Sequence, residues 1–126
     1  MSDDTVQHVY MGLTQKMQSC QKQLGQIEAQ IGANQRETRL ASLTKREVEG
    51  LDSAVPLYRS LGKMFVQESK DDIMRDLNKT TGDAATLIEA LEKKKKFVTR
   101  DLNEASANLK DLVKQTQARA ATAASG

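Results

Sequence analysis

The chain has few of the residues that normally fill a globular interior. It contains 126 residues but no tryptophan, two tyrosines and two phenylalanines, so aromatic residues make up only 3% of the sequence. A compact core with a buried active site usually needs more bulky apolar side chains than this. No nucleotide-binding glycine motif is present either. We therefore expect a protein that is not an enzyme and binds no cofactor.

Single cysteine and histidine residues exclude further classes of site. Cys20 has no second cysteine with which to form an intrachain disulfide, which is typical of a reducing compartment. His8 is the only histidine and has no cysteine within one helical turn, so we expect a solvated side chain rather than a metal site. The net charge is only +2, and positive and negative residues alternate along the chain, which does not favour a nucleic-acid interface.

The sequence also gives no sign of membrane targeting. Its N-terminal residues lack the basic start and apolar run of a secretory signal, and no apolar stretch approaches the ~20 residues needed to span a bilayer. We expect a protein of the cytoplasm, with access to the nucleus, that binds no membrane.

Two long segments have apolar residues at spacings that alternate between three and four. This is the a/d pattern of a coiled coil, so the sequence predicts two long helices that pair along this a/d seam. Cys20 falls within it and is expected to pack as a small apolar residue, with a thiol activated by Lys95 as the alternative. The seam positions are Val6, Tyr10, Leu13, Met17, Cys20, Leu24, Ile27, Ile31, Asn34, Thr38 and Ala41 in the first segment, and Met74, Leu77, Thr81, Ala84, Ile88, Leu91, Lys95, Val98, Leu102, Ala105, Leu109 and Leu112 in the second.

An antiparallel pair must set a positions of one helix against d positions of the other. Pairing residues whose numbers sum to 115 does so and places Asn34 opposite Thr81. A shift by one heptad places Asn34 opposite Ile88, where an unpaired amide costs about 1–3 kcal/mol. The sequence therefore predicts the register in which Asn34 faces Thr81.

Capping signals predict where the helices begin and end. Ser69, followed by acidic residues, predicts a second long helix over about 70–114. Thr44 and Glu47 form another capping box, which predicts that the first long helix covers about 5–42 and that a short helix follows over about 45–51. The alanine-rich tail, residues 115–126, is expected to fray or be disordered. All these elements belong to one predicted domain over residues 1–126.

A β-hairpin is predicted between the helices, over about residues 56–68. Two runs with strand-forming residues flank Gly62 and Lys63, which suit a two-residue turn with glycine first. An isolated two-stranded hairpin is marginally stable and its free edges accept further strands, so we expect other chains to complete it. The residues expected at this contact are Leu57, Tyr58, Leu61, Gly62, Met64, Phe65 and Val66.

Extra apolar residues lie beside the seam near the chain ends. Such a surplus suits the capture of exposed hydrophobic segments, although a broadened packing face or frayed helix ends are equally compatible with it. The predicted binding residues are Val6, Val9, Tyr10, Met11, Leu13, Leu109, Leu112 and Val113. A lysine run, Lys93 to Lys96, is interpreted as a solvated collar, with a nucleic-acid patch and a localisation signal as alternatives.

The order of these elements resembles the prefoldin family, and within it the β-class, which has one hairpin. The resemblance covers about residues 5–115. It includes the LT-x-x-E motif that ends in Glu47 and the LYRSLGKMFVQES hairpin that starts at Leu57. Its most specific residues are Tyr58, Gly62, Met64, Phe65, Gln67, Ser69 and Lys70.

The resemblance implies a mainly α fold in which two long antiparallel coiled-coil helices are joined by a β-hairpin that completes an inter-subunit β-barrel. It further implies a heterohexamer of two α-class and four β-class subunits. Such complexes capture unfolded actin and tubulin without ATP and deliver them to the cytosolic group II chaperonin. The chaperonin is a further conceivable partner for the lysine run. A coiled-coil tether or scaffold that binds folded partner helices is the alternative, but a plain tether does not need a hairpin at its bend.

Overall fold

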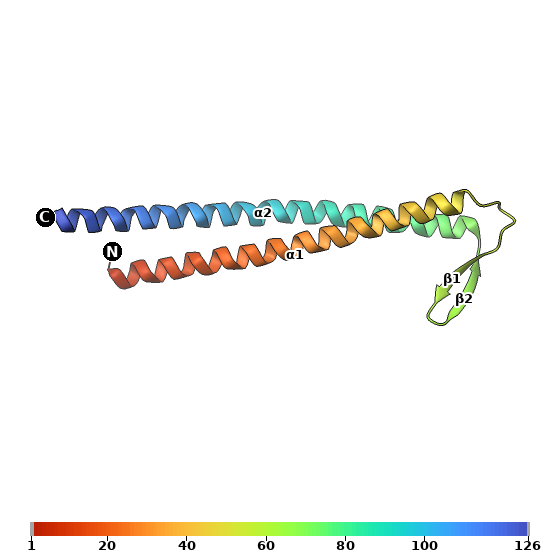
Figure 1. Cartoon of the computed structure of the whole chain (residues 1–126), viewed down its shortest axis with the longest axis horizontal. Coiled ribbons are helices and arrows are strands. Elements are labelled where there is room, and N and C mark those ends of the chain that lie inside the picture. The colour runs from red at the N-terminus through yellow and green to blue at the C-terminus, as the bar shows by residue number, and fades with distance from the viewer. Residues whose placement is uncertain (1, 126) are drawn as a thin grey trace. The chain divides into compact units, whose positions relative to one another are not determined.

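The structure, a computed structural model, describes residues 2–125. Two long helices flank one antiparallel hairpin in the order α1 (Asp3–Glu49), β1 (Leu57–Leu61), β2 (Met64–Glu68) and α2 (Lys70–Ser125) (Figure 1). The predicted fold class, mainly α with a small β-hairpin, is confirmed.

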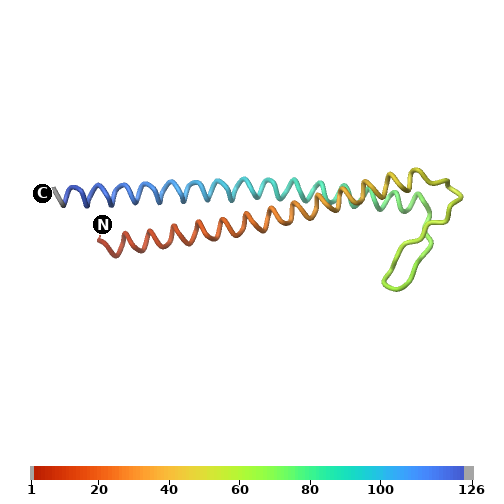
Figure 2. Tube along the Cα trace, in the orientation of Figure 1, coloured from red at the N-terminus to blue at the C-terminus, as the bar shows by residue number. Residues whose placement is uncertain are grey.

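The chain divides into two compact units, which we describe separately. The helical unit comprises residues 2–29 and 92–125. It therefore contains the first part of α1 and the last part of α2 but no strand. The hairpin unit comprises residues 30–91 and contains the end of α1, both strands and the start of α2. The Cα trace in Figure 2 shows that α1 and α2 run in opposite directions within each unit.

Burial follows the predicted a/d seam in both units. Each buried apolar side chain of the described residues lies at an a or d position, and Cys20 is among them, as predicted for a packing thiol. Tyr10 is the exception among the predicted seam residues, because 47% of its surface is exposed. The buried set consists of Cys20, Ile27, Val98, Ala105 and Leu112 in the helical unit, and Ile31, Ala41, Val48, Ala84 and Leu91 in the hairpin unit.

Helix α1 is continuous to Glu49, so the predicted end near residue 42 and the separate short helix over 45–51 are wrong. The Thr44 hydroxyl donates a hydrogen bond to the Leu40 carbonyl oxygen at 2.9 Å, the usual interaction of a threonine inside a helix. Lys45 and Val48 continue the spacing of three and four, and Val48 is only 8% exposed. Packing along the seam therefore outweighs the local capping signal.

Helix α2 begins as predicted but extends further. Ser69 is its N-cap, because its side-chain oxygen accepts a hydrogen bond from the Asp72 backbone N–H at 3.2 Å. The helix then continues to Ser125, so the prediction that residues 115–126 fray is wrong for the described part of this tail. Alanine has the highest helix propensity of all residues, which explains why an alanine-rich segment without a seam remains helical.

The predicted register is also wrong, by about one heptad in the helical unit. Lys95 Nζ lies 3.7 Å from Glu28 Oε1. The predicted register would set Lys95 level with Cys20, eight residues from Glu28, which is about 12 Å along a helix. The two side chains could not bridge that separation.

A groove at the chain ends supports the same correction. Val6 and Tyr10 line it together with Leu112 and Thr116. The numbers of Tyr10 and Leu112 sum to 122, as do those of Val6 and Thr116, rather than to the predicted 115. Helix α1 ends at Glu49, seven residues later than the predicted end near residue 42, and the register shift in the helical unit has the same size.

The polar pair on which the predicted register rested does not form. In the hairpin unit, Asn34 Nδ2 donates a hydrogen bond to the Gln30 carbonyl oxygen at 2.8 Å. Thr81 Oγ1 likewise donates to the Leu77 carbonyl oxygen at 2.9 Å. The Asn34 amide nitrogen and the Thr81 hydroxyl thus each donate within their own helix, so Asn34 needs no partner on α2 for this donor and does not select a register.

The hairpin agrees with its prediction. Its strands pair in a ladder that runs from Leu57 opposite Glu68 to Leu61 opposite Met64. Gly62 adopts a φ of +62° at the first position of the two-residue turn, a conformation that glycine adopts without strain. Within the described residues, no helix is long and apolar enough to span a membrane.

Candidate interaction surfaces

An arginine clamp ties one face of the hairpin to α2. Side chains alternate between the two faces of a strand, and Arg59 lies on the face that also carries Glu68. Arg59 Nη2 is 3.1 Å from Glu68 Oε2 and also donates a hydrogen bond to Asp76 on α2. This pair of contacts fixes which hairpin face turns toward the helix.

The Arg59 guanidinium of this clamp remains charged under all ordinary conditions. The hydrogen bond to Asp76 raises the pKa of the Arg59 guanidinium above its usual value, and the negative charges of Glu68 and Asp76 add to this effect against the opposing effect of burial. Sequence reasoning did not find the clamp. Its only signal was a charged residue among the apolar residues of one strand face.

The opposite face of the hairpin and its turn expose large apolar side chains. Tyr58 and Phe65 lie on this outer face, and Phe65 is 72% exposed. Leu61 and Met64 are exposed beside the turn, and Val66 is also exposed. In the part of the chain that the structure describes, each strand has only the other as a partner. The hairpin thus presents two open edges and an apolar surface.

Of the seven predicted hairpin residues, five are therefore exposed apolar residues, and the other two have different positions. Leu57 is half-buried on the clamp face, and Gly62 forms the turn. The root of the hairpin is held by Lys70, whose Nζ donates hydrogen bonds to the carbonyl oxygens of Leu51 at 2.9 Å and Glu49 at 3.4 Å. The apolar surface is consequently displayed on a fixed base.

In the helical unit, four of the eight predicted binding residues come together. Val6, Tyr10, Leu112 and Val113 line a groove of about 240 Å³. Three polar residues, Gln7, Thr116 and Gln117, complete the lining. Tyr10 supplies its exposed ring to this groove instead of packing in the seam as predicted. We call this feature the terminal groove.

The other four predicted binding residues lie outside the terminal groove. Val9 and Met11 are exposed, whereas Leu13 is half-buried in the seam. Leu109 is half-buried and lines a neighbouring groove of about 310 Å³ with Val113. The predicted set therefore mixes exposed residues with residues that hold the two helices together.

Sequence reasoning missed two large exposed residues, Leu40 and Leu43, on α1 in the hairpin unit. Both are apolar residues of α1 that do not occupy a or d positions. Comparing every large apolar residue with the heptad pattern would have identified them as exposed. Leu87 and Phe97 on α2 are exposed as well. These residues contribute apolar surface beyond the hairpin and the terminal groove.

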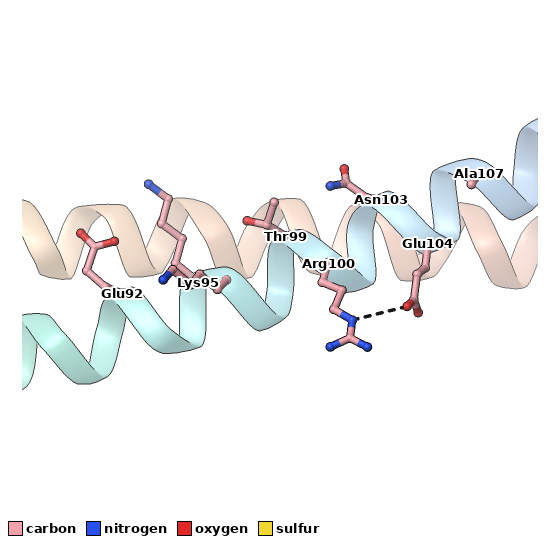
Figure 3. Close-up of a pocket in the computed structure, with 8 residues that line it drawn as sticks. Glu92, Lys95, Thr99, Arg100, Asn103, Glu104 and Ala107 are labelled. Atoms are coloured by element: carbon pink, nitrogen blue, oxygen red, sulfur yellow. Dashed lines mark ion pairs between the residues drawn. The ribbon is translucent and has the colours of Figure 1, made fainter.

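A shallow groove of about 600 Å³ follows α2 in the helical unit, from Glu92 to Ala107 (Figure 3). Charges of both signs line it, and Arg100 Nε lies 3.6 Å from Glu104 Oε1. Across residues 2–125 the structure contains no group of three His, Cys, Asp or Glu residues that could hold a metal ion.

Comparison with known proteins identifies the family. The family model for prefoldin subunits matches residues 12–116, which is most of the chain and includes the hairpin and most of each helix. The chain belongs to the prefoldin family. Membership implies a co-chaperone role and assembly with other prefoldin subunits, and members of the family are not enzymes.

Similar curated proteins agree along nearly their whole length. A probable prefoldin subunit 1 of Caenorhabditis briggsae is 27% identical over 113 residues, which cover 90% of this chain and 97% of that protein. Prefoldin subunit 1 of Tetraodon nigroviridis is 26% identical over 117 residues, which cover 93% and 96%.

A solved structure agrees with the fold. The crystal structure of the prefoldin beta subunit from Thermococcus strain KS-1 superposes with a TM-score of 0.73 at 24% sequence identity, covering 81% of this chain and 90% of that one. This likeness extends to the single hairpin between two long helices.

Proposed function

We propose that this prefoldin subunit is a β-class member of a heterohexamer of two α-class and four β-class subunits. The complex captures unfolded or nascent proteins, with actin and tubulin as the expected clients, and delivers them without ATP to the cytosolic group II chaperonin. It acts in the cytoplasm, with access to the nucleus.

The observation that carries the assembly proposal is the open, apolar hairpin. A two-stranded sheet with exposed Tyr58, Leu61, Met64 and Phe65 is poorly stable in water on its own. Strands of other subunits can hydrogen-bond to its edges and cover these side chains, forming the β-barrel that the family resemblance implies. The Arg59 clamp supports this proposal, because it holds the hairpin in a fixed orientation on α2.

The client proposal is supported by the exposed apolar residues of the helical unit. Val9, Tyr10, Met11 and Val113 contribute apolar surface, some of it around the terminal groove. Burial of apolar surface stabilises a complex by about 25 cal/mol per Å², so one such surface binds a client weakly. Several subunits that bind one client together gain avidity without any new contact.

The assembly proposal can be tested with Phe65→Asp. A charge at this exposed position should not disturb the helices, but it should prevent burial of the hairpin face in a barrel. We expect the variant to co-purify with its partner subunits at less than about a tenth of the wild-type yield, since an unpaired buried charge costs several kcal/mol. Circular dichroism should report unchanged helix content.

Leu87→Asp is the matched control, because Leu87 is also large and exposed but lies on α2 outside the hairpin. Its complex should assemble normally. If Phe65→Asp assembles as well as this control, the hairpin is not the assembly surface.

Client capture can be tested by replacing Val9, Tyr10, Met11 and Val113 together with serine. Leu13 and Leu109 are left unchanged because they help to pair the helices. The hexamer should remain intact by native mass spectrometry, while the concentration that half-suppresses aggregation of denatured actin should rise at least about fivefold. Leu87→Ser is the control.

The same variant separates the proposal from the alternative, a tether that binds folded partner helices. Unchanged suppression of aggregation by the fourfold variant would exclude the chain ends as the client site. A tether should bind a folded helical partner and show no preference for denatured protein.

A further inference from the structure

All aromatic side chains of this subunit are exposed, although such residues usually lie in a core. The chain has two tyrosines and two phenylalanines. Tyr10 lines the terminal groove, and Tyr58 and Phe65 lie on the hairpin. Phe97 belongs to neither surface, yet 67% of it is exposed. Neither assembly through the hairpin nor client capture at the terminal groove therefore explains why Phe97 is exposed.

Phe97 lies on the outer side of α2, surrounded by cationic residues. It occupies a c position of the heptad, outside the seam. Lys93 precedes it by one helical turn and Arg100 follows it by one turn. Together with Lys96, these three residues line a groove of about 230 Å³. This basic groove shares Lys96 and Arg100 with the larger groove of Figure 3.

Among the residues that the structure describes, little negative charge neutralises Lys96 and Arg100 beside Phe97. Lys95 points its ammonium group toward Glu28 on α1, but Lys96 has no ion pair with any residue that the structure describes. Arg100 pairs only loosely with Glu104, at 3.6 Å, and both side chains are largely exposed. An ion pair this exposed contributes little free energy, so Arg100 can exchange Glu104 for a carboxylate of a ligand.

We propose that the basic groove is a docking site for an acidic segment of a partner protein that carries one apolar or aromatic side chain. That side chain packs against the Phe97 ring, and carboxylates on either side of it pair with Lys96 and Arg100. From Lys93 to Arg100 the helix rises about 10 Å, which equals about three residues of an extended peptide. The ligand is thus a short acidic–apolar–acidic motif.

The structure favours a peptide over a nucleic acid. Glu92, Asp101 and Glu104 interrupt the cations on both sides of the groove, so a continuous phosphate backbone would meet negative charge. Tight nucleic-acid binding typically uses about six to ten phosphate contacts, more than this short groove offers. The proposal does not depend on the client site, because it uses only the middle of α2.

The proposal can be tested by fluorescence anisotropy on the assembled complex. The probe is a labelled acidic hexapeptide with one central phenylalanine. Phe97→Ser should weaken its binding about five- to tenfold through loss of apolar contact. Lys96→Gln with Arg100→Gln should weaken it about three- to tenfold and reduce its salt dependence. Leu87→Ser, an exposed apolar residue elsewhere on α2, should change nothing.

Two further probes make the outcome decisive. A hexapeptide with serine in place of the phenylalanine should bind wild type as weakly as the original peptide binds Phe97→Ser. A single-stranded hexanucleotide should bind less well than the acidic peptide. Equal binding of the peptide to wild type and Phe97→Ser overturns the proposal, as does tighter binding of the hexanucleotide. Loss of the hexamer in Phe97→Ser would show that this face contacts another subunit and would also overturn it.

Discussion

Disulfide cross-linking can test the corrected helix register directly. Two cysteines link without backbone movement only when their Cα atoms are about 4.4–6.8 Å apart. In the observed register Met17 lies level with Ala105, since their numbers sum to 122, like those of Tyr10 and Leu112. In the rejected register Met17 would lie level with Val98 instead.

These two pairings differ by seven residues, or about 10.5 Å along the helix. This distance alone exceeds the reach of a disulfide, so only one of the two pairs can be oxidised. In a Cys20→Ala background, we expect the double variant Met17→Cys/Ala105→Cys to cross-link within one chain under mild oxidation. The variant Met17→Cys/Val98→Cys should remain reduced.

The cross-link should also stabilise the helical unit. Closing a loop of roughly 90 residues removes unfolded-state entropy worth about 4–5 kcal/mol, less any strain in the folded state. Non-reducing electrophoresis and peptide mass spectrometry identify the bond, and urea unfolding with and without reductant measures the gain. Faster oxidation of the Met17/Val98 pair would refute the register that we assign.

Three local predictions concern the helices, and each is measured by urea unfolding of the assembled complex. Ser69→Ala should lower the free energy of unfolding by about 1 kcal/mol because it removes the N-cap of α2, and an unchanged value would contradict the cap. Thr44→Ala should cost nothing or stabilise slightly, because Thr44 lies inside α1, so a loss of about 1 kcal/mol would restore the rejected helix break. Gly25→Ala should stabilise by about 0.5–1 kcal/mol, because an added Cβ meets no atom within 4 Å, and any loss would show an undetected contact there.

The a/d seam was predictable because burial in a coiled coil follows sequence period alone. A residue three or four positions from its buried neighbour returns to the same helix face, whatever the partner helix does. The hairpin was predictable for a similar reason. Gly62 at a two-residue turn fixes both the turn and the strand pairing around it.

The register could not be derived in the same way, because a heptad pattern looks identical after a shift of seven residues. Only a feature that breaks the repeat can distinguish the alternatives, and Asn34 appeared to be one. Its side chain has a second option, a hydrogen bond to the Gln30 carbonyl within its own helix, and this removes the energetic difference between registers.

The surfaces were predicted only in part, because exposure depends on tertiary packing. Tyr10 fits the seam spacing, yet its ring lines the terminal groove. It lies close to the start of α1, where fewer neighbouring side chains can cover it. The Arg59 clamp depends on the angle between the hairpin and α2, for which the sequence carries no local signal.

The end of α1 shows how local and long-range signals should be weighed. A threonine followed by a glutamate three residues later matches a capping box, but Thr44 satisfies its hydroxyl equally well inside a helix. Val48 has no comparable alternative, because leaving a valine exposed forfeits about 1.5 kcal/mol or more of burial energy. A break after residue 42 would have removed Val48 from the seam. The Thr44 hydroxyl can form a hydrogen bond either as a cap or inside the helix, whereas Val48 loses burial energy unless the helix continues. The burial of Val48 therefore determines where α1 ends.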